Sequence, residues 1–512
     1  MRKADKNMSG NSILRIFFVG ISLLLQIGWI LMRVQWLNDY SEVISAITAL
    51  LSVSIVLKLN SKHTNAAMKM PWIMLILALP VLGLCMYLRF ELLGDPGIGK
   101  RLRAVRRKIR KEMPENDASA LFHLSQQDLT AAGQSRCISR QAGVSLYENT
   151  AVKYYADTND ALEDMKAALS QAERFIFMEY FIVGDGSAFR ELEQILVQKA
   201  RQGVEVRLMY DDIGSMGKVN MRFAKRLNSQ GIRCVPFNPA LPFLNLFLNH
   251  RDHRKITVVD GKVGFTGGYN LADEYFHRTN PYGIWKDTGL RLEGEAVRSL
   301  TATFLELWCV QTRESAGFEP YLDIRHSVPA RGFVQPFGDN PLDAERIAED
   351  VYLTMIHQSQ KKLYILTPYL IITDEMQHAL GLAALRGVDV RIITPGIPDK
   401  KTVYAVTRSY YSALLRQGVR IFEYTPGFCH GKQCLCDDRI ASIGTSNLDY
   451  RSLYHHFENN VLLMDCEAIG DMAADFDFMF SQCREVTMDY TAGRSVLIRM
   501  WQYILRLFAP LL

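Results

Sequence analysis

Hydrophobic and polar residues divide the chain into an apolar beginning and a long alternating body. Three apolar segments precede residue 95: Ile13–Met32, about Val43–Leu59, and Pro71–Phe90. A helix that spans a membrane needs about 20 apolar residues, so the first and third are long enough and the second is marginal. A cleaved signal peptide is disfavoured, because no small-residue cleavage site follows the first segment and further apolar segments do. We therefore expect a membrane region with two to three transmembrane helices over residues 1–95.

From about residue 147 the pattern changes to strand-like apolar runs that alternate with helical stretches. Arg174–Val183 is strand-like, a helical stretch follows, and Gly203–Asp212 is a second strand-like run. The same order recurs from Lys362 onward. A strand, a helix that ends in glycine and another strand form a βαβ unit, which has parallel strands and helices on the sheet faces. The body is predicted to be α/β.

The two passages are copies of one another. Lys199–Leu208 (KARQGVEVRL) matches Ala383–Ile392 (AALRGVDVRI), and Arg226–Arg233 (RLNSQGIR) matches Ala413–Arg420 (ALLRQGVR). This duplication predicts two pseudo-symmetric α/β halves packed together. We place the first half at residues 147–325 and the second at 326–490.

The last segment, 491–512, has apolar residues at helical spacing together with Arg499 and Arg506. It is predicted to be an amphipathic helix. Two placements are open: in the membrane interface, or docked on the core as an ordinary terminal helix.

Charge and cysteine usage narrow the cellular setting. The formal net charge of +5 is too small to indicate a nucleic-acid binder. Nine scattered cysteines, an odd number, indicate reduced thiols rather than a disulfide scaffold. Lys100–Lys111 holds eight basic residues and no acid, and such clusters beside membrane segments favour the cytoplasmic side. We expect residues 96–146 to be a basic juxtamembrane linker, and the catalytic body to lie on the cytoplasmic face of the cell membrane.

A polar motif occurs once in each copy. In both, lysine follows histidine by two residues, aspartate by seven, glycine by 14 and asparagine by 17. The first copy comprises His253, Lys255, Asp260, Gly267, Gly268 and Asn270, and the second comprises His430, Lys432, Asp437, Gly444, Thr445 and Asn447. The recurrence of the full pattern at the same place in each repeat indicates one shared function.

The composition of the motif suits phosphoryl transfer. Residues i and i+2 of a strand point to the same face, so His253 and Lys255, and likewise His430 and Lys432, can enter one pocket. Ammonium groups and amides would neutralise phosphate oxygens. One imidazole can attack phosphorus, and the other can protonate the leaving alkoxide. Fixed cations replace a metal here, so neither a metal nor another cofactor is expected.

Each imidazole also needs a partner for its second ring nitrogen. Lys286–Gly294 (KDTGLRLEG) aligns with Phe457–Asp465 (FENNVLLMD), which pairs Asp287 with Glu458. These two acids are the candidate histidine-orienting groups. The alternative is that both are surface acids at the start of a strand.

The cysteines around His430 invite a zinc hypothesis, which the repeat argues against. Cys429, Cys434 and Cys436 have no usual zinc-ligand spacing. The first copy has non-cysteine residues at the corresponding places: Asp252, Thr257 and Val259. The three cysteines are predicted to be packing residues.

The doubled motif resembles that of the phospholipase D superfamily. The N-terminal apolar segments and the phrases GGYNLADEY, WKDTGLRLEG, GTSNLDYRS and RLFAPLL are similar to those of bacterial cardiolipin synthases, from about residue 70 to the end. The resemblance implies one site made by both motifs, which transfers a phosphatidyl group between two phosphatidylglycerol molecules and yields cardiolipin and glycerol. It also implies an integral protein of the bacterial plasma membrane whose partners are phosphatidylglycerol and other membrane lipids, with no nucleic acid.

The resemblance carries over to individual residues. The catalytic candidates are His253, Lys255, Asp260, His430, Lys432 and Asp437, with the two aspartates mainly structural. The phosphate-binding candidates are Asn270, Asn447, Thr445 and Gly268. By analogy His253 is the nucleophile and His430 the general acid. The first motif departs from the family pattern, because Gly268 stands where serine or threonine is frequent, as at Thr445.

Three competing functions remain open or are disfavoured. A phospholipase D-type hydrolase, or a transphosphatidylase with another acceptor alcohol, would use the same site. A nuclease is disfavoured by the membrane segments and by the lack of a basic surface interleaved with aromatic residues. A catalytically inactive lipid-binding scaffold is the alternative from another class.

Two further features lie near the first motif. His250 is predicted to be a loop residue near the pocket mouth. The apolar insert Pro239–Asn249 either dips into the bilayer or packs on the body.

Overall fold

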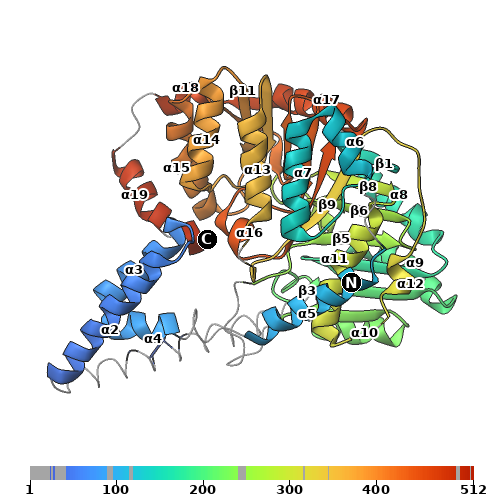
Figure 1. Ribbon diagram of the computed structural model, residues 1–512, viewed down its shortest axis with the longest axis horizontal. Helices are drawn as coiled ribbons and strands as arrows, with labels where there is room; N and C mark the ends of the chain where they lie inside the picture. Colours follow the sequence, from blue (N-terminus) through green and yellow to red (C-terminus); the bar gives the residue numbers. More distant parts are fainter. Residues whose placement is uncertain are drawn as a thin grey trace.

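The computed structural model shows two α/β halves side by side, with a group of N-terminal helices at one end (Figure 1). It describes residues 42–88, 96–114, 119–239, 250–314, 317–343, 345–491, 496–507 and 509–511, together with a few isolated positions before residue 42. The first predicted apolar segment lies almost entirely outside these residues. The insert does too, apart from Pro239.

The first half is built on a seven-stranded mixed sheet in the order β1-β8-β6-β5-β2-β3-β4. The strands β2, β3 and β4 are parallel, and the others are joined by antiparallel pairing. Their bounds are β1 Thr150–Tyr155, β2 Phe175–Tyr180, β3 Glu205–Asp211, β4 Arg233–Phe237, β5 Lys255–Val259, β6 Val263–Gly267 and β8 Gly289–Gly294.

The second half repeats this order as β9-β16-β15-β14-β10-β11-β12 and adds β17 beyond β12. Its parallel strands are β10, β11 and β12. The bounds are β9 Phe333–Asp339, β10 Lys362–Leu366, β11 Asp389–Pro395, β12 Arg420–Tyr424, β14 Gln433–Cys436, β15 Ile440–Gly444, β16 Glu458–Met464 and β17 Cys483–Glu485. The prediction of two duplicated α/β halves with parallel βαβ units is confirmed.

The matched glycines of the repeat end equivalent helices. Gly203 and Gly387 follow α9 (Ser187–Arg201) and α14 (Asp374–Leu385), with φ of 90° and 94°. No atom would crowd a Cβ at either position. Glycine is therefore favoured by the left-handed backbone that stops the helix and returns the chain to the sheet.

Helices cover both faces of each sheet. Neighbouring strand residues point to opposite faces, and both faces carry apolar side chains that the helices bury. In the first sheet Ile176 and Met178 pack with α8 and α9, whereas Phe175 and Phe177 pack with α11. In the second sheet the corresponding layers are α13–α15 and α17. The core around α11 and α17 contains strand residues of both halves and joins them.

The remaining bounds are α8 Thr158–Ser170, α10 Phe223–Ser229, α11 Val297–Thr312, α12 Glu319–Leu322, α13 Ile347–Gln358, α15 Lys401–Leu415, α16 Tyr450–Tyr454, α17 Ala468–Gln482 and α18 Thr487–Thr491.

The N-terminal helices project from the body (Figure 1). They are α2 (Glu42–Ser61), α3 (Ala66–Ala78) and α4 (Pro80–Tyr87). The third predicted span is thus interrupted at Leu79, next to Pro80, which lacks a backbone N–H. Among the helices that the structure describes, none is both long and apolar enough to cross a membrane.

The stretch 96–146, predicted to be a basic juxtamembrane linker, is mostly helical. It forms α5 (Pro96–Glu112), α6 (Ser119–Gln127) and α7 (Leu129–Ala142). In α5 the residues Leu102, Val105 and Ile109 recur at helical spacing and are buried in the core between the halves. The basic side chains between them obscured this apolar stripe in the sequence.

The C-terminal helix α19 (Val496–Leu507) packs against α15 and is followed by the short η3 (Ala509–Leu511). Met500, Trp501 and Ile504 on α19 remain exposed. The helix therefore docks on the body while it keeps an apolar surface.

Candidate active site

The two motif histidines lie in loops just before strands, and each loop is hydrogen-bonded to the other half. The strands β5 and β14 begin at Lys255 and Gln433, after the histidines. The His253 backbone N–H donates to the Phe457 carbonyl at 2.9 Å, and the His430 N–H donates to the Lys286 carbonyl at 2.7 Å. Next to the hydrogen bond between His430 and Lys286, the two halves are also joined by parallel pairing of β7 (Ile284–Lys286) with β13 (Gly427–Cys429).

Each orienting carboxylate belongs to the half opposite to that of the histidine it contacts. His253 Nδ1 lies 3.0 Å from both carboxylate oxygens of Glu458. His430 Nδ1 lies 2.7 Å from Asp287 Oδ2. Both acids are fully buried, which excludes the alternative that they are surface groups. When Nδ1–H donates to a carboxylate, the lone pair of Nε2 is left for chemistry.

The two motif lysines lie beside the histidines. Lys255 Nζ donates to the His253 carbonyl at 2.6 Å, and Lys432 Nζ donates to the carbonyl of His430. Burial, and then the charge of Lys432, lower the pKa of Lys255 to about 7. Burial likewise lowers the pKa of Lys432 to about 8. The effect of the Lys432 charge on Lys255 indicates that the two motifs meet in one electrostatic site.

Both histidines are held neutral. Burial lowers the pKa of His253 to about 3 and outweighs the opposing charge of Glu458. Burial, together with Lys432, lowers the pKa of His430 to about 4. Although burial raises the pKa values of Glu458 and Asp287, their histidine partners bring both below the ordinary range. Each pair is therefore a neutral imidazole that donates to a carboxylate, with a nucleophilic nitrogen free of its proton at neutral pH.

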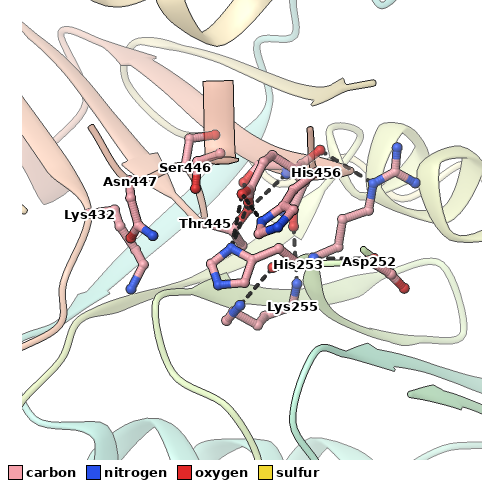
Figure 2. Close-up of polar contacts among 12 residues, drawn as sticks. Asp252, His253, Lys255, Lys432, Thr445, Ser446, Asn447 and His456 are labelled. Atoms are coloured by element: carbon pink, nitrogen blue, oxygen red, sulfur yellow. Dashed lines mark hydrogen bonds and ion pairs between the residues drawn. The ribbon is translucent and has the colours of Figure 1, made fainter. Parts of the chain in front are cut away.

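The asparagines of the two motifs are buried but make different contacts. Asn270 Oδ1 accepts from the Ile182 backbone N–H at 3.0 Å. Asn447 donates to Asp449 at 3.1 Å, and its side-chain oxygen makes no hydrogen bond within the described part of the chain. Figure 2 shows Asn447 beside Lys432, from the second motif.

Thr445 and Gly268, the other phosphate-binding candidates, are engaged elsewhere. The Thr445 hydroxyl donates to Glu458, so it positions the carboxylate of that residue. The Gly268 N–H donates to the Thr288 carbonyl at 3.0 Å. A Cβ at Gly268 would stand 2.1 Å from Asp287 Oδ1. The absence of serine or threonine at this position thus has a steric reason.

The motif aspartates lie at the far ends of β5 and β14, away from the histidines. Asp260 and Asp437 have φ of 53° and 52°. Their carboxylates accept three backbone N–H groups each, from residues Glu173–Phe175 and Gln360–Lys362, at 2.7 to 2.9 Å. They fix the start of β2 and β10, which fits a structural role, and they do not touch the site.

One histidine at the site, His456, is replaced by a different residue type in the other half. The His456 ring lies 5.5 Å from the His253 ring (Figure 2). The equivalent place beside His430 holds Trp285, at 5.4 Å. Both residues stand two positions before the orienting acid, which is the signal in the sequence that could have revealed His456.

His250, the predicted pocket-mouth residue, contacts another histidine segment. Its Nδ1 lies 3.1 Å from the His455 carbonyl oxygen, and the two rings are 6.3 Å apart. It follows directly after the insert, whose course lies outside the described residues.

The cysteines are all unpaired. Cys429, Cys434 and Cys436 are buried among apolar residues, and burial raises the pKa of each thiol. These are the properties of packing residues, as predicted.

Two sheets of the same strand order that share one pair of His-x-Lys motifs define the phospholipase D class of fold. A phosphatidylserine synthase from Haemophilus influenzae has a similar structure, with a TM-score of 0.55 and 16% identity over 74% of this chain and 97% of its own. The low identity limits this likeness to the fold.

Sequence comparison narrows the class. The family described as cardiolipin synthase, PLD-like domain, matches residues 165–308 and 352–480, and a phospholipase D-nuclease N-terminal family matches 46–91. A cardiolipin synthase of Halalkalibacterium halodurans is 34% identical over 93% of this chain and 95% of its own. An uncharacterised protein of Streptococcus mutans is 40% identical over 89% and 99%. The chain belongs to the cardiolipin synthase family of phospholipase D-like proteins.

Proposed function

We propose that this protein is a cardiolipin synthase that joins two phosphatidylglycerol molecules through a phosphohistidine and releases glycerol. Family membership supports a phosphatidyltransferase. The single observation that carries the mechanism is the convergence of two neutral imidazoles, each on a carboxylate of the opposite half. Such a pair can supply one nucleophile and one proton carrier.

In the first step His253 Nε2 attacks phosphorus and the bond to the glycerol oxygen breaks. His430, which takes up a proton at Nε2 when the phosphodiester anion binds beside it, donates that proton to the glycerol oxygen, so glycerol leaves neutral. In the second step a hydroxyl of another phosphatidylglycerol gives its proton to His430 and displaces His253 from phosphorus. The shorter contact of His430 with Asp287, 2.7 Å against 3.0 Å for His253 with Glu458, favours His430 as the group that becomes cationic.

The lysines and amides would bind the non-bridging phosphate oxygens. Lys255 and Lys432 have lowered pKa values because they are buried without a ligand. An entering phosphodiester anion raises these values and returns both ammonium groups to full charge. Asn447 and Asn270 complete this set through their amide N–H groups, once that of Asn447 leaves Asp449.

The N-terminal region would anchor the active site at the membrane, where its lipid substrate lies. The apolar segments before residue 95 support an integral, multi-pass anchor, as does the family match at 46–91. On α2 and α3, Leu50, Leu57, Met74 and Leu77 are exposed, as lipid-facing residues would be. The basic face of α5 supports a cytoplasmic body.

The reaction is tested by supplying phosphatidylglycerol alone to the full-length protein in its membrane and resolving the products. Cardiolipin and glycerol in equal amounts support the proposal, and phosphatidic acid alone would replace it with a hydrolase. His253→Ala should abolish turnover, whereas an inactive scaffold would lose nothing.

The anchor is tested separately. The protein should stay with membranes washed at alkaline pH, and release by the wash contradicts the anchor. In a Cys85→Ser variant, the exposed Cys137 on α7 reports the side of the body. An impermeant thiol reagent should label Cys137 only after cells are opened, and labelling in intact cells contradicts a cytoplasmic body.

A further inference from the structure

The site contains a histidine that neither the duplicated motif nor the proposed reaction uses. His456 is buried, 9% exposed, and neither of its ring nitrogens makes a hydrogen bond within the described residues. Its Nδ1 lies 3.7 Å from Glu458 Oε1, beyond hydrogen-bond distance. A buried imidazole without a partner loses its hydration without compensation, so this one needs an explanation.

Packing does not supply that explanation. The equivalent position in the first half holds Trp285 beside His430, and its one ring nitrogen is a donor only, which cannot bind a metal. Next to His253 the chain instead places a ring with two polar nitrogens. The two residues occupy equivalent places beside the two motif histidines, so His456 and Trp285 differ in what their ring nitrogens can bind rather than in position.

Three donors meet at this point. One ligand atom from each of His253, His456 and Glu458 lies within 4.8 Å of the others, and all three residues are buried. Two imidazoles and one carboxylate are a donor set that Zn²⁺ takes, with bonds of about 2.0 to 2.2 Å and a fourth position left open. Glu458 begins β16 and His456 stands two residues before it, so one short stretch of chain supplies two of the three donors.

We propose that His253, His456 and Glu458 form a binding site for a divalent transition metal such as Zn²⁺, and that the bound metal switches the enzyme off. The proposal rests on the proposed function only for the second part. It goes beyond the expectation from the sequence, which had no metal in the site.

The donor types suit a metal. Imidazole and carboxylate bind metals in their proton-free forms, and both types are gathered here. The Lys255 side chain, which donates to the His253 carbonyl at 2.6 Å, is the nearby group that opposes a cation.

Inhibition follows from the chemistry of His253. A metal on Nε2 takes the lone pair that attacks phosphorus. A metal on Nδ1 displaces the proton shared with Glu458 and leaves a proton on Nε2 instead. In either case no nucleophilic nitrogen remains, and removal of the metal restores it.

The test measures binding and turnover on the full-length protein in detergent. The variants are His456→Asn and a matched control, His123→Asn, which alters a surface histidine paired with Glu148. Calorimetry with Zn²⁺ alone should show one site that is equal in wild type and His123→Asn, and weaker by at least about 10-fold in His456→Asn. Co²⁺ should give a visible absorption band in wild type that His456→Asn lacks. If His456→Asn does not fold, His456→Gln replaces it.

Turnover of phosphatidylglycerol is then followed at increasing Zn²⁺, each variant being compared with its own metal-free rate. Wild type and His123→Asn should be inhibited and then restored by a chelator, while Mg²⁺, which prefers oxygen ligands, has no effect. His456→Asn should need at least about 10-fold more Zn²⁺.

The outcomes separate the claims. Equal Zn²⁺ affinity in wild type and His456→Asn, or no 1:1 binding in wild type, overturns the metal site. Binding through His456 without inhibition overturns the switch. Binding without any turnover of phosphatidylglycerol in metal-free protein leaves the metal site standing and contradicts the proposed function.

Discussion

His253 Nδ1 lies 3.0 Å from both carboxylate oxygens of Glu458, although the two residues are 205 positions apart and belong to different halves. The same exchange in the other direction joins His430 to Asp287. Each half therefore holds a histidine and the acid for the other half's histidine. Neither half alone presents an oriented imidazole, so both halves are required for the site.

Replacement of Glu458 by glutamine should lower kcat by about 100- to 10,000-fold. The glutamine can still accept from His253 Nδ1–H, but the negative charge that stabilises the transition state is gone. Turnover of phosphatidylglycerol measures this, with Glu163→Gln, an exposed acid on α8, as the matched control. Full activity in the Glu458→Gln protein would show that the pairing is only structural.

Replacement of Gly268 by alanine should displace Asp287 from His430. The added Cβ would meet Asp287 Oδ1 at 2.1 Å and the His430 carbonyl oxygen at 3.1 Å. Overpacking of this kind costs about 1–3 kcal/mol of stability, and the turnover of the folded protein should fall as well. Gly133→Ala is the control, because no atom lies within 4 Å of its added Cβ. A Gly268→Ala enzyme of normal activity and melting temperature would contradict this steric account.

Replacement of Asp437 by asparagine should affect stability before activity. The carboxylate accepts three backbone N–H groups at the start of β10, and hydrogen bonds to a charged group contribute about 1.5–3 kcal/mol each. Asparagine keeps one acceptor oxygen and tolerates the positive φ, so part of this is retained. Denaturant unfolding should show a loss of about 1–3 kcal/mol, with kcat per folded molecule within a few-fold of wild type. A collapse of kcat at unchanged stability would return Asp437 to the catalytic set.

Much of the fold and the central part of the site could be predicted from the sequence, because both copies of the repeat carry the same pattern of residues. The matches around Gly203 and Gly387 located equivalent helix ends, and these glycines have the left-handed backbone of such ends. The doubled histidine and lysine placed the chemistry. Alignment of the two copies also paired Asp287 with Glu458, but similarity between copies does not reveal which histidine each acid faces.

What the sequence did not reveal depends on contacts between distant segments. The crossed pairing arises from backbone hydrogen bonds such as that from His253 N–H to the Phe457 carbonyl, which leave no mark in a repeat. His456 was missed for the opposite reason: it departs from the repeat, where the first half has Trp285. In α5 the apolar stripe was hidden by the basic residues between its members.

The lysines should give the enzyme a pH dependence that ordinary lysines would not. Burial lowers the pKa of Lys255 to about 7 and of Lys432 to about 8. Because a lysine is charged below its pKa, the free site holds its full positive charge only below about pH 7 and loses it as pH rises through these values. The phosphodiester anion must then recharge the lysines on binding, which costs affinity.

We therefore expect kcat/KM, which reports the free enzyme, to fall as pH rises above about 7 to 8. On the acid side the nucleophile should stay free of a proton down to about pH 5, because the pKa of His253 is lowered to about 3. The measurement is kcat/KM for phosphatidylglycerol in detergent micelles from about pH 5 to about pH 9.5. Lys255→Arg, whose guanidinium stays charged throughout, should move the alkaline decline upward in its residual activity. If kcat/KM of the wild type stays level to about pH 9.5, the lysines remain charged in the free enzyme, and the site is more open to water than its burial indicates.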